Sequence, residues 1–193
     1  VLMNIPNLFR LSYTLVDCLS RYRSNLVLEH SLNLSHMRDL CALSAVLPLC
    51  LMADRFKLVS PAFFSLADPF WHALMVIGIV FVYLLLRYSL FTFFRPYKLP
   101  SEVSVAVRHV LYTYSVIMVA VMLVTVAIML NINPSEADIR KALIWEAALM
   151  YFMVLLREFQ IYTGYVHGLI TILYLCALEL LPTGALIAGN ILL

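Results

Sequence analysis

Ionisable side chains inside long apolar stretches are the residues of this sequence best suited to chemistry. Arg87, Glu146 and Glu179 interrupt apolar runs, and His72 and His167 stand nearer the ends of such runs. A charge in the hydrocarbon core of a membrane costs about 2.5 kcal/mol or more, so such a residue usually has a partner or a functional role. Carboxylates, imidazoles and guanidinium groups at this depth can carry protons, bind ions or hold a polar substrate.

Two interpretations of these groups remain open. In the first they form a proton or ion path, or a substrate site between helices. In the second they hydrogen-bond between helices and fix the packing, with Arg87 extending towards the inner interface. Alternating helix directions predict an outer polar layer of His72, Glu146 and Glu179 and an inner layer of Arg87, His109, Arg157 and His167. We expect Glu179 to face the interior and to meet Glu146, through a shared proton, or His72.

Other kinds of site have little support in the sequence. It contains no HExxH, no GxSxG, no glycine-rich phosphate loop and no paired-carboxylate signature of an intramembrane protease. His109 and His167 are the plausible haem pair, but neither helix shows a paired spacing. The four cysteines form no CxxC pair. We therefore expect no catalytic residue, no metal and no cofactor. A non-catalytic role is favoured over an enzymatic one.

Composition identifies the class of protein to which these residues belong. The chain has 193 residues, of which 64% are hydrophobic and 12% charged, and its mean hydropathy is +0.95. Ordinary soluble domains carry roughly 45–50% apolar and about 25% charged residues. The net charge is +2, and the basic residues form no run of the kind that binds nucleic acid. The sequence predicts an all-α polytopic transmembrane bundle in contact with the lipid bilayer and with no nucleic-acid partner.

About five spans are expected in a transmembrane domain of residues 38–193. The first, Leu40 to Ala53, is the weakest, since it covers roughly 21 Å of a core of roughly 30 Å. Either its helix extends over Leu34 to Lys57 or the segment is re-entrant. The other four spans are expected at Pro69 to Phe94, at His109 to Ser135 after a cap at Ser101, from Ala142 to about Arg157 and Glu158, and from about Tyr165 to Pro182.

Capping residues and prolines predict where these helices begin and end. Asn133, Pro134 and Glu136 stand at the N-cap, first and third positions of the fourth helix. At the C-terminus, Pro182 leaves two alternatives. The last helix continues past a proline kink, or it stops near Leu181 and the tail folds back at the interface.

Residues 1–37 predict an amphipathic helix. Its apolar face consists of Leu8, Leu11, Leu15, Cys18, Tyr22 and Leu26, and its polar face of Arg10, Thr14, Asp17, Arg21 and Ser24. Such a helix lies in the headgroup region or packs on the spans or on a partner protein. A protein partner would bind through Leu8, Leu11, Leu15 and Tyr22. The sequence before residue 10 shows no cleavable signal peptide.

The distribution of basic residues predicts a cytoplasmic N-terminus. With that orientation the inner segments hold eight basic residues: Arg10, Arg21, Arg23, Arg38, Arg95, Lys98, Arg108 and Arg157. The outer segments hold four: Arg55, Lys57, Arg140 and Lys141. Cytoplasmic loops of membrane proteins carry the excess of Lys and Arg.

The C-terminal run YLCALELLP, from Tyr174 to Pro182, resembles the closing signature of a family of uncharacterised multi-span bacterial inner-membrane proteins. The resemblance covers roughly the last forty residues. It implies that Tyr174, Cys176, Glu179 and Pro182 are marked positions, and it implies a bacterial inner-membrane location but no reaction. We expect a non-catalytic subunit or scaffold of an envelope assembly. The alternatives are a small transporter or proton-linked permease, followed by a membrane-embedded enzyme.

Overall fold

The computed structural model describes residues 13–18, 31–58, 69–93, 101–132 and 134–192, and the regular structure in these ranges is helical. Four long helices are α3 (Leu32–Arg55), α4 (Pro69–Phe93), α5 (Ser101–Ile132) and α6 (Glu136–Thr163). A last rod joins α7 (Gly168–Leu175), the π-helical turn η3 (Cys176–Leu180) and α8 (Leu181–Leu192). The expected all-α bundle is confirmed.

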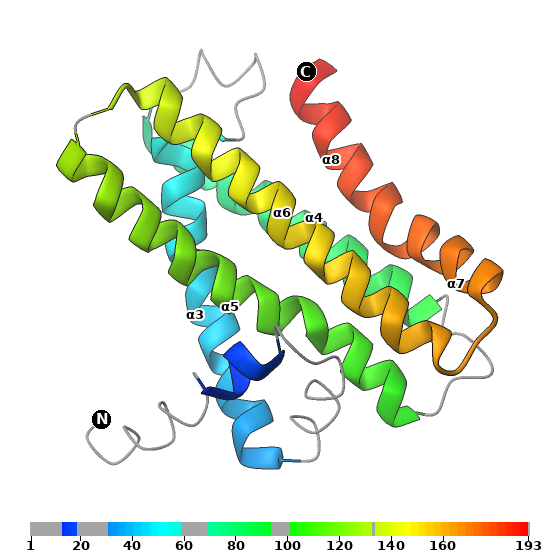
Figure 1. Cartoon of the computed structure of the whole chain (residues 1–193). Coiled ribbons are helices and arrows are strands. Elements are labelled where there is room, and N and C mark those ends of the chain that lie inside the picture. Colours follow the sequence, from blue (N-terminus) through cyan, green and yellow to red (C-terminus); the bar gives the residue numbers. More distant parts are fainter. Residues whose placement is uncertain (1–12, 19–30, 59–68, 94–100, 133, 193) are drawn as a thin grey trace.

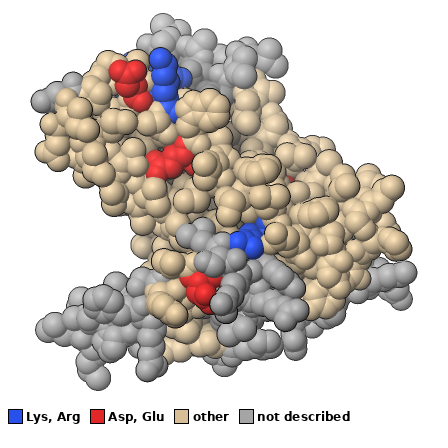
Figure 2. Space-filling model, in the orientation of Figure 1, with Lys and Arg blue, Asp and Glu red and all other residues tan. Residues whose placement is uncertain are grey.

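Among the described residues, four helical segments are long and apolar enough to cross a membrane: Asn33–Arg55, Phe70–Phe93, Val103–Ile132 and Gly168–Gly189. The fifth expected span lies in α6 and is not among them, because Glu146, Arg157 and Glu158 interrupt its apolar part. Figure 2 shows one face of the molecule, on which a few charged side chains are separated by wide uncharged surface. Exposed Leu, Ile, Val and Phe side chains on the long helices suit contact with lipid.

The helices pack in a ring. α3 contacts α4 and α5, α5 contacts α6, and α6 contacts α7, while η3 and α8 return to α4. In Figure 1, α5 and α6 lie side by side, and the C-terminal rod runs back along the bundle from the end of α6. Buried apolar side chains of α5, α6 and η3, including Val107, Val154 and Leu178, form one core cluster. The contacts of η3 and α8 with α4 close the ring.

The first span is one continuous helix. α3 has 24 residues and contains Pro48 without a break, which at 1.5 Å per residue gives a length of about 36 Å. The extended alternative, Leu34 to Lys57, agrees with α3 to within two residues at each end, and the unbroken helix contradicts a re-entrant segment. The second span, expected from Pro69 to Phe94, agrees with α4 to within one residue.

Both ends of α6 differ from the sequence prediction. Ser135 is the N-cap, not Asn133, because its Oγ accepts a hydrogen bond of 3.2 Å from the backbone N–H of Asp138 and donates one of 2.6 Å to the Asp138 carboxylate. The capping pair is thus shifted by two residues. The C-terminus was expected near Glu158, but α6 continues to Thr163. Charged residues mark a helix end only when they face water, and Arg157 and Glu158 are buried.

The last rod continues past Pro182, as one of the two alternatives predicts. A proline in a helix has no N–H to donate, and its ring clashes with the carbonyl group four residues earlier. Widening one turn from α to π geometry relieves that clash. In η3 the backbone N–H of Leu181 donates to the carbonyl of Cys176, five residues back. This turn carries Glu179.

The N-terminal segment is described only at residues 13–18, which are helical. Leu15 and Cys18 are buried, whereas Tyr13 and Val16 are exposed. The hydroxyl of Tyr114, on α5, donates a 3.3 Å hydrogen bond to the carbonyl of Cys18. This part of the predicted amphipathic helix therefore packs on the spans. Leu8, Leu11, Tyr22, Arg10 and Arg21 lie outside the described residues.

Cys18 should react slowly with thiol reagents. Burial and the neighbouring Asp17 carboxylate raise the pKa of its thiol to about 11. At pH 8 only about one thiol in a thousand is then the reactive thiolate. We expect maleimide labelling of Cys18 in the folded protein to be at least about ten-fold slower than in detergent-denatured protein. Peptide mass spectrometry measures this, with Cys18→Ser as the control. Equal rates in the two states would contradict the packing of this segment.

Candidate functional site

Three buried charged residues from three elements meet in the bundle. Arg87 of α4 is 4% exposed, and Glu158 of α6 and Glu179 of η3 are both 0% exposed. Arg87 Nη2 donates a 2.9 Å hydrogen bond to Glu158 Oε1. Its Nε donates a 2.8 Å bond to Glu179 Oε1, which also accepts from Nη2. We call Arg87, Glu158 and Glu179 the triad.

Local helix geometry positions each member of the triad. Arg87 and Phe91 are one turn apart on α4, and the guanidinium carbon lies 5.1 Å from the centre of the Phe91 ring. A cation over an aromatic face is attracted to it, which fixes the direction of the side chain. Glu158 lies one turn before the C-terminal end of α6. Glu179 reaches Arg87 from the π-helical turn.

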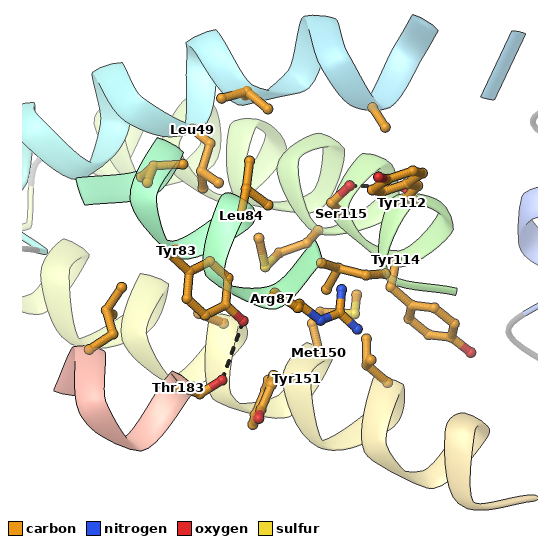
Figure 3. Close-up of a pocket in the computed structure, with 18 of the residues that line it drawn as sticks. Leu49, Tyr83, Leu84, Arg87, Tyr112, Tyr114, Ser115, Met150, Tyr151 and Thr183 are labelled. Atoms are coloured by element: carbon orange, nitrogen blue, oxygen red, sulfur yellow. Dashed lines mark hydrogen bonds between the residues drawn. The ribbon is translucent and has the colours of Figure 1, made fainter. Parts of the chain in front are cut away.

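Hydroxyl groups hold the backbone of the π-helical turn in place. The carbonyl of Glu179 accepts hydrogen bonds from the Tyr151 hydroxyl at 3.0 Å and from Thr183 Oγ1 at 2.8 Å. Tyr83 Oη lies 3.3 Å from Thr183 Oγ1, and Figure 3 shows these side chains approaching one another beside Arg87. The Tyr151 bond connects the π-helical turn to α6.

The triad carries more negative than positive charge when both carboxyl groups are ionised. Arg87 supplies one positive charge, and Glu158 and Glu179 supply two negative ones. Arg87 reaches only Oε1 of each carboxyl group, and each Oε2 is buried without a hydrogen-bond partner among the described residues. Such a site ties three helices together through charge-assisted hydrogen bonds and still has free acceptors.

A cavity of about 810 Å³, partly open to the outside, lies within the ring. Its walls are mainly apolar and come from α3, α4, α5, α6 and α8. Its polar lining includes Tyr83, Arg87, Tyr151 and Thr183, and Arg87 points into it in Figure 3. Glu158 and Glu179 do not line it. Arg87 is therefore shared between the cavity wall and the carboxylates behind it.

Arg87 and Glu179, which were expected in different polar layers, are in direct contact in the structure. Arg87 was expected in the inner half and Glu179 in the outer half, which is wrong, since the two side chains are hydrogen-bonded. The error came from ending the last helix near Pro182. Because the rod runs to Leu192, Glu179 stands near its middle and not near its outer end.

The expected partners of Glu179 are also wrong. Glu146 lies beside Thr125, whose Oγ1 donates to Glu146 Oε1 at 3.2 Å. His72 is paired with Asp54. The prediction that Glu179 faces the interior and meets a polar partner is confirmed, but the partner is Arg87, which also binds Glu158.

The other candidates have separate environments. His167 is the N-cap residue of α7 and is exposed, whereas His109 Nδ1 lies 2.8 Å from Arg38 Nη2. Tyr174 is partly buried against the α5–α6 core cluster. In the part of the chain that the structure describes, no group of three or more His, Cys, Asp or Glu side chains is arranged to hold a metal ion.

Glu158 is the site residue that the sequence analysis missed, because it was taken as a charged flank of a span. The spacing between Glu158 and the tyrosines of the same helix could have indicated that it faces the interior. Tyr151 lies seven residues before Glu158 and Tyr162 four residues after it. Residues at these spacings share one helix face. The partly buried Tyr151 and the buried Tyr162 mark that face as the interior one.

In comparisons with protein-family models, curated proteins and solved structures, no significant match to this chain is found.

Proposed function

We propose that this chain is a non-catalytic multi-pass membrane protein that holds a lipid-class molecule in the cavity of its helix ring. A lipid-class molecule here means one apolar chain with a small polar group. The observation that carries the proposal is the mainly apolar cavity of about 810 Å³, whose wall includes Tyr83, Tyr151 and Thr183 beside Arg87.

The size of the cavity supports an occupant. Ligand sites measure about 300–1,000 Å³ and are lined mainly by apolar side chains with a few polar groups. The cavity is within that range, and Leu84 and Met118 are typical of its walls. An apolar chain would restore the packing contacts that an empty space would lack.

The polar groups on the wall support a molecule with two unlike parts. Tyr83, Tyr151 and Thr183 lie together with Arg87 on one side of the cavity (Figure 3). Their hydroxyl groups can exchange hydrogen bonds with a polar group of the ligand. Arg87 already donates to two carboxylates, so its charge is already paired. Arg108, the other arginine of the lining, lies over the Tyr88 ring.

The wider setting is part of the same proposal. We place the protein in the bacterial inner membrane with its N-terminus in the cytoplasm, on the basic-residue distribution and the C-terminal resemblance. A role as a subunit of an envelope assembly stays a prediction, because Leu8, Leu11 and Tyr22 of the expected partner surface lie outside the described residues. Movement of the bound molecule across the membrane is the second candidate, favoured by the charged triad beside the cavity.

Filling the cavity should expel the ligand. Ala147 lines the cavity, so Ala147→Trp places a large ring inside it. We expect the lipid that co-purifies with the protein in mild detergent to fall about ten-fold or more, which corresponds to about 1.4 kcal/mol. Solvent extraction followed by mass spectrometry measures lipid per protein. Ala127→Trp is the matched control, because Ala127 is exposed on α5 outside the cavity lining and should leave retention unchanged.

A circular dichroism melt establishes that each variant is folded, and Val80→Phe offers a second way to fill the cavity. Wild-type protein that retains no lipid through delipidation, or equal retention in Ala147→Trp and Ala127→Trp, would rule out the cavity as the binding site.

A further inference from the structure

We propose that the triad is a proton-binding site in which one proton is held between the carboxyl groups of Glu158 and Glu179, with Arg87 neutralising the second carboxylate. This inference concerns the carboxyl pair behind the cavity wall. It does not depend on a ligand in the cavity.

Charge balance is the first argument. The side chains of Arg87, Glu158 and Glu179 are 5%, 1% and 1% exposed, so water cannot screen their charges. A surplus charge in a low-dielectric site is costly unless it is paired or neutralised. One guanidinium balances one carboxylate. Binding one proton to the carboxyl pair brings the site to zero net charge, which is why two acids around a single base favour one proton.

The hydrogen bonds also indicate that the carboxyl pair binds one proton. Arg87 donates only to Oε1 atoms, and Glu158 Oε2 and Glu179 Oε2 are buried without partners among the residues that the structure describes. An ionised carboxylate can only accept, whereas a protonated one has an O–H to donate. The two carboxyl groups lie next to each other, because Arg87 Nη2 donates to Oε1 of both. A single O–H on either group therefore supplies a donor to the other.

Other titratable groups around the pair leave this balance unchanged. Tyr83 faces it from α4, Tyr151 and Tyr162 from α6. Tyr174, on α7, lies next to Tyr162. Tyrosine is neutral at physiological pH. Arg157, the neighbour of Glu158 in sequence, donates hydrogen bonds to other residues: its Nε donates to Tyr114 Oη at 3.2 Å and its Nη1 to Gln160 Oε1 at 2.8 Å.

Infrared spectroscopy can detect the proposed proton, because a protonated carboxylic acid has a C=O band that a carboxylate lacks. The protein is reconstituted in phosphatidylcholine vesicles near neutral pH in H₂O and D₂O. All variants carry Glu146→Gln, which removes another carboxyl group with a buried unpartnered oxygen. We expect the parent to show one deuterium-sensitive acid band. Glu158→Gln and Glu179→Gln should each abolish it, because the remaining carboxylate then pairs with Arg87.

Glu136→Gln is the matched control. Glu136 is 78% exposed in a surface pair with Arg55, and its replacement should leave the band intact. A parent without the band would overturn the proposal, and so would a band that survives in both Gln variants. Loss in only one variant would place the proton on a single residue and refute sharing. If a Gln variant does not fold, Glu158→Asp and Glu179→Asp keep the acid. Both Asp variants should then shift the frequency of the acid C=O band, and an unshifted band would refute the assignment of the proton to this carboxyl pair.

Discussion

Replacing Arg87 with Met is expected to lower the free energy of unfolding by about 3–5 kcal/mol, because it leaves buried carboxyl groups without their cation. Methionine fills much of the same space, so the loss reflects charge and hydrogen bonding more than a cavity. The contacts at risk are those of Arg87 with Glu158 and Glu179, which connect α4 to α6 and η3. Denaturant titration in micelles, followed by circular dichroism, measures the change.

The matched control is Leu86→Met on the same turn of α4. Leu86 is 43% exposed, and an exposed, volume-conserving change should stay within about 0.5 kcal/mol of the wild type. Glu179→Gln should cost less than Arg87→Met, since it leaves Arg87 paired with Glu158. An Arg87→Met protein as stable as Leu86→Met would show that the triad does not hold the helices together.

Arg38→Met has the second-largest expected effect, about 1.5–3 kcal/mol of lost stability. Arg38 is 1% exposed, and its Nη2 bonds Asp39 Oδ1 at 2.7 Å, Ser35 Oγ at 3.1 Å and His109 Nδ1 at 2.8 Å. The His109 contact joins α3 to α5. Because Asp39 is 38% exposed, water can replace part of what the arginine supplies, so the cost should be below that of Arg87→Met.

Arg55→Met is the control for Arg38→Met, since it removes the same side chain from the same helix. Arg55 and Glu136 are 73% and 78% exposed and lie 3.4 Å apart. Exposed ion pairs contribute about 0–1 kcal/mol. If the two arginine variants lose the same stability in parallel denaturant titrations, the burial of Arg38 would have no energetic consequence.

Helix type and position could be predicted because apolar runs and capping residues are local signals. Pro69 begins α4 as expected, α5 begins at Ser101, which was expected to be its cap, and the last helix continues past Pro182 as one of the two alternatives predicts. The shifted cap at Ser135 shows the usual difficulty of placing a boundary when several capping residues are adjacent.

The site was only partly predictable, because partners across helices depend on depth and rotation. Counting residues along a last span that ends at Pro182 placed Glu179 too close to the outer surface. Glu179 and Arg87 were therefore expected at different depths. Glu158 was hidden because a charge next to Arg157 resembles the end of a span. The π-helical turn, which sets the direction of Glu179, arises from Pro182 within a continuing helix. Its effect on rotation is not visible in hydrophobic periodicity.

The interaction between Arg87 and Glu179 is tested most directly by a double-mutant cycle. Unfolding free energies are measured in micelles for the wild type, Arg87→Met, Glu179→Gln and the double variant. Residues in direct contact show coupling energies of about 0.5–3 kcal/mol. We predict a value in the upper half of that range, with the double variant less destabilised than the sum of the single ones, since removing both groups leaves fewer unpaired charges. Additivity within about 0.5 kcal/mol would contradict a direct buried contact between the two residues.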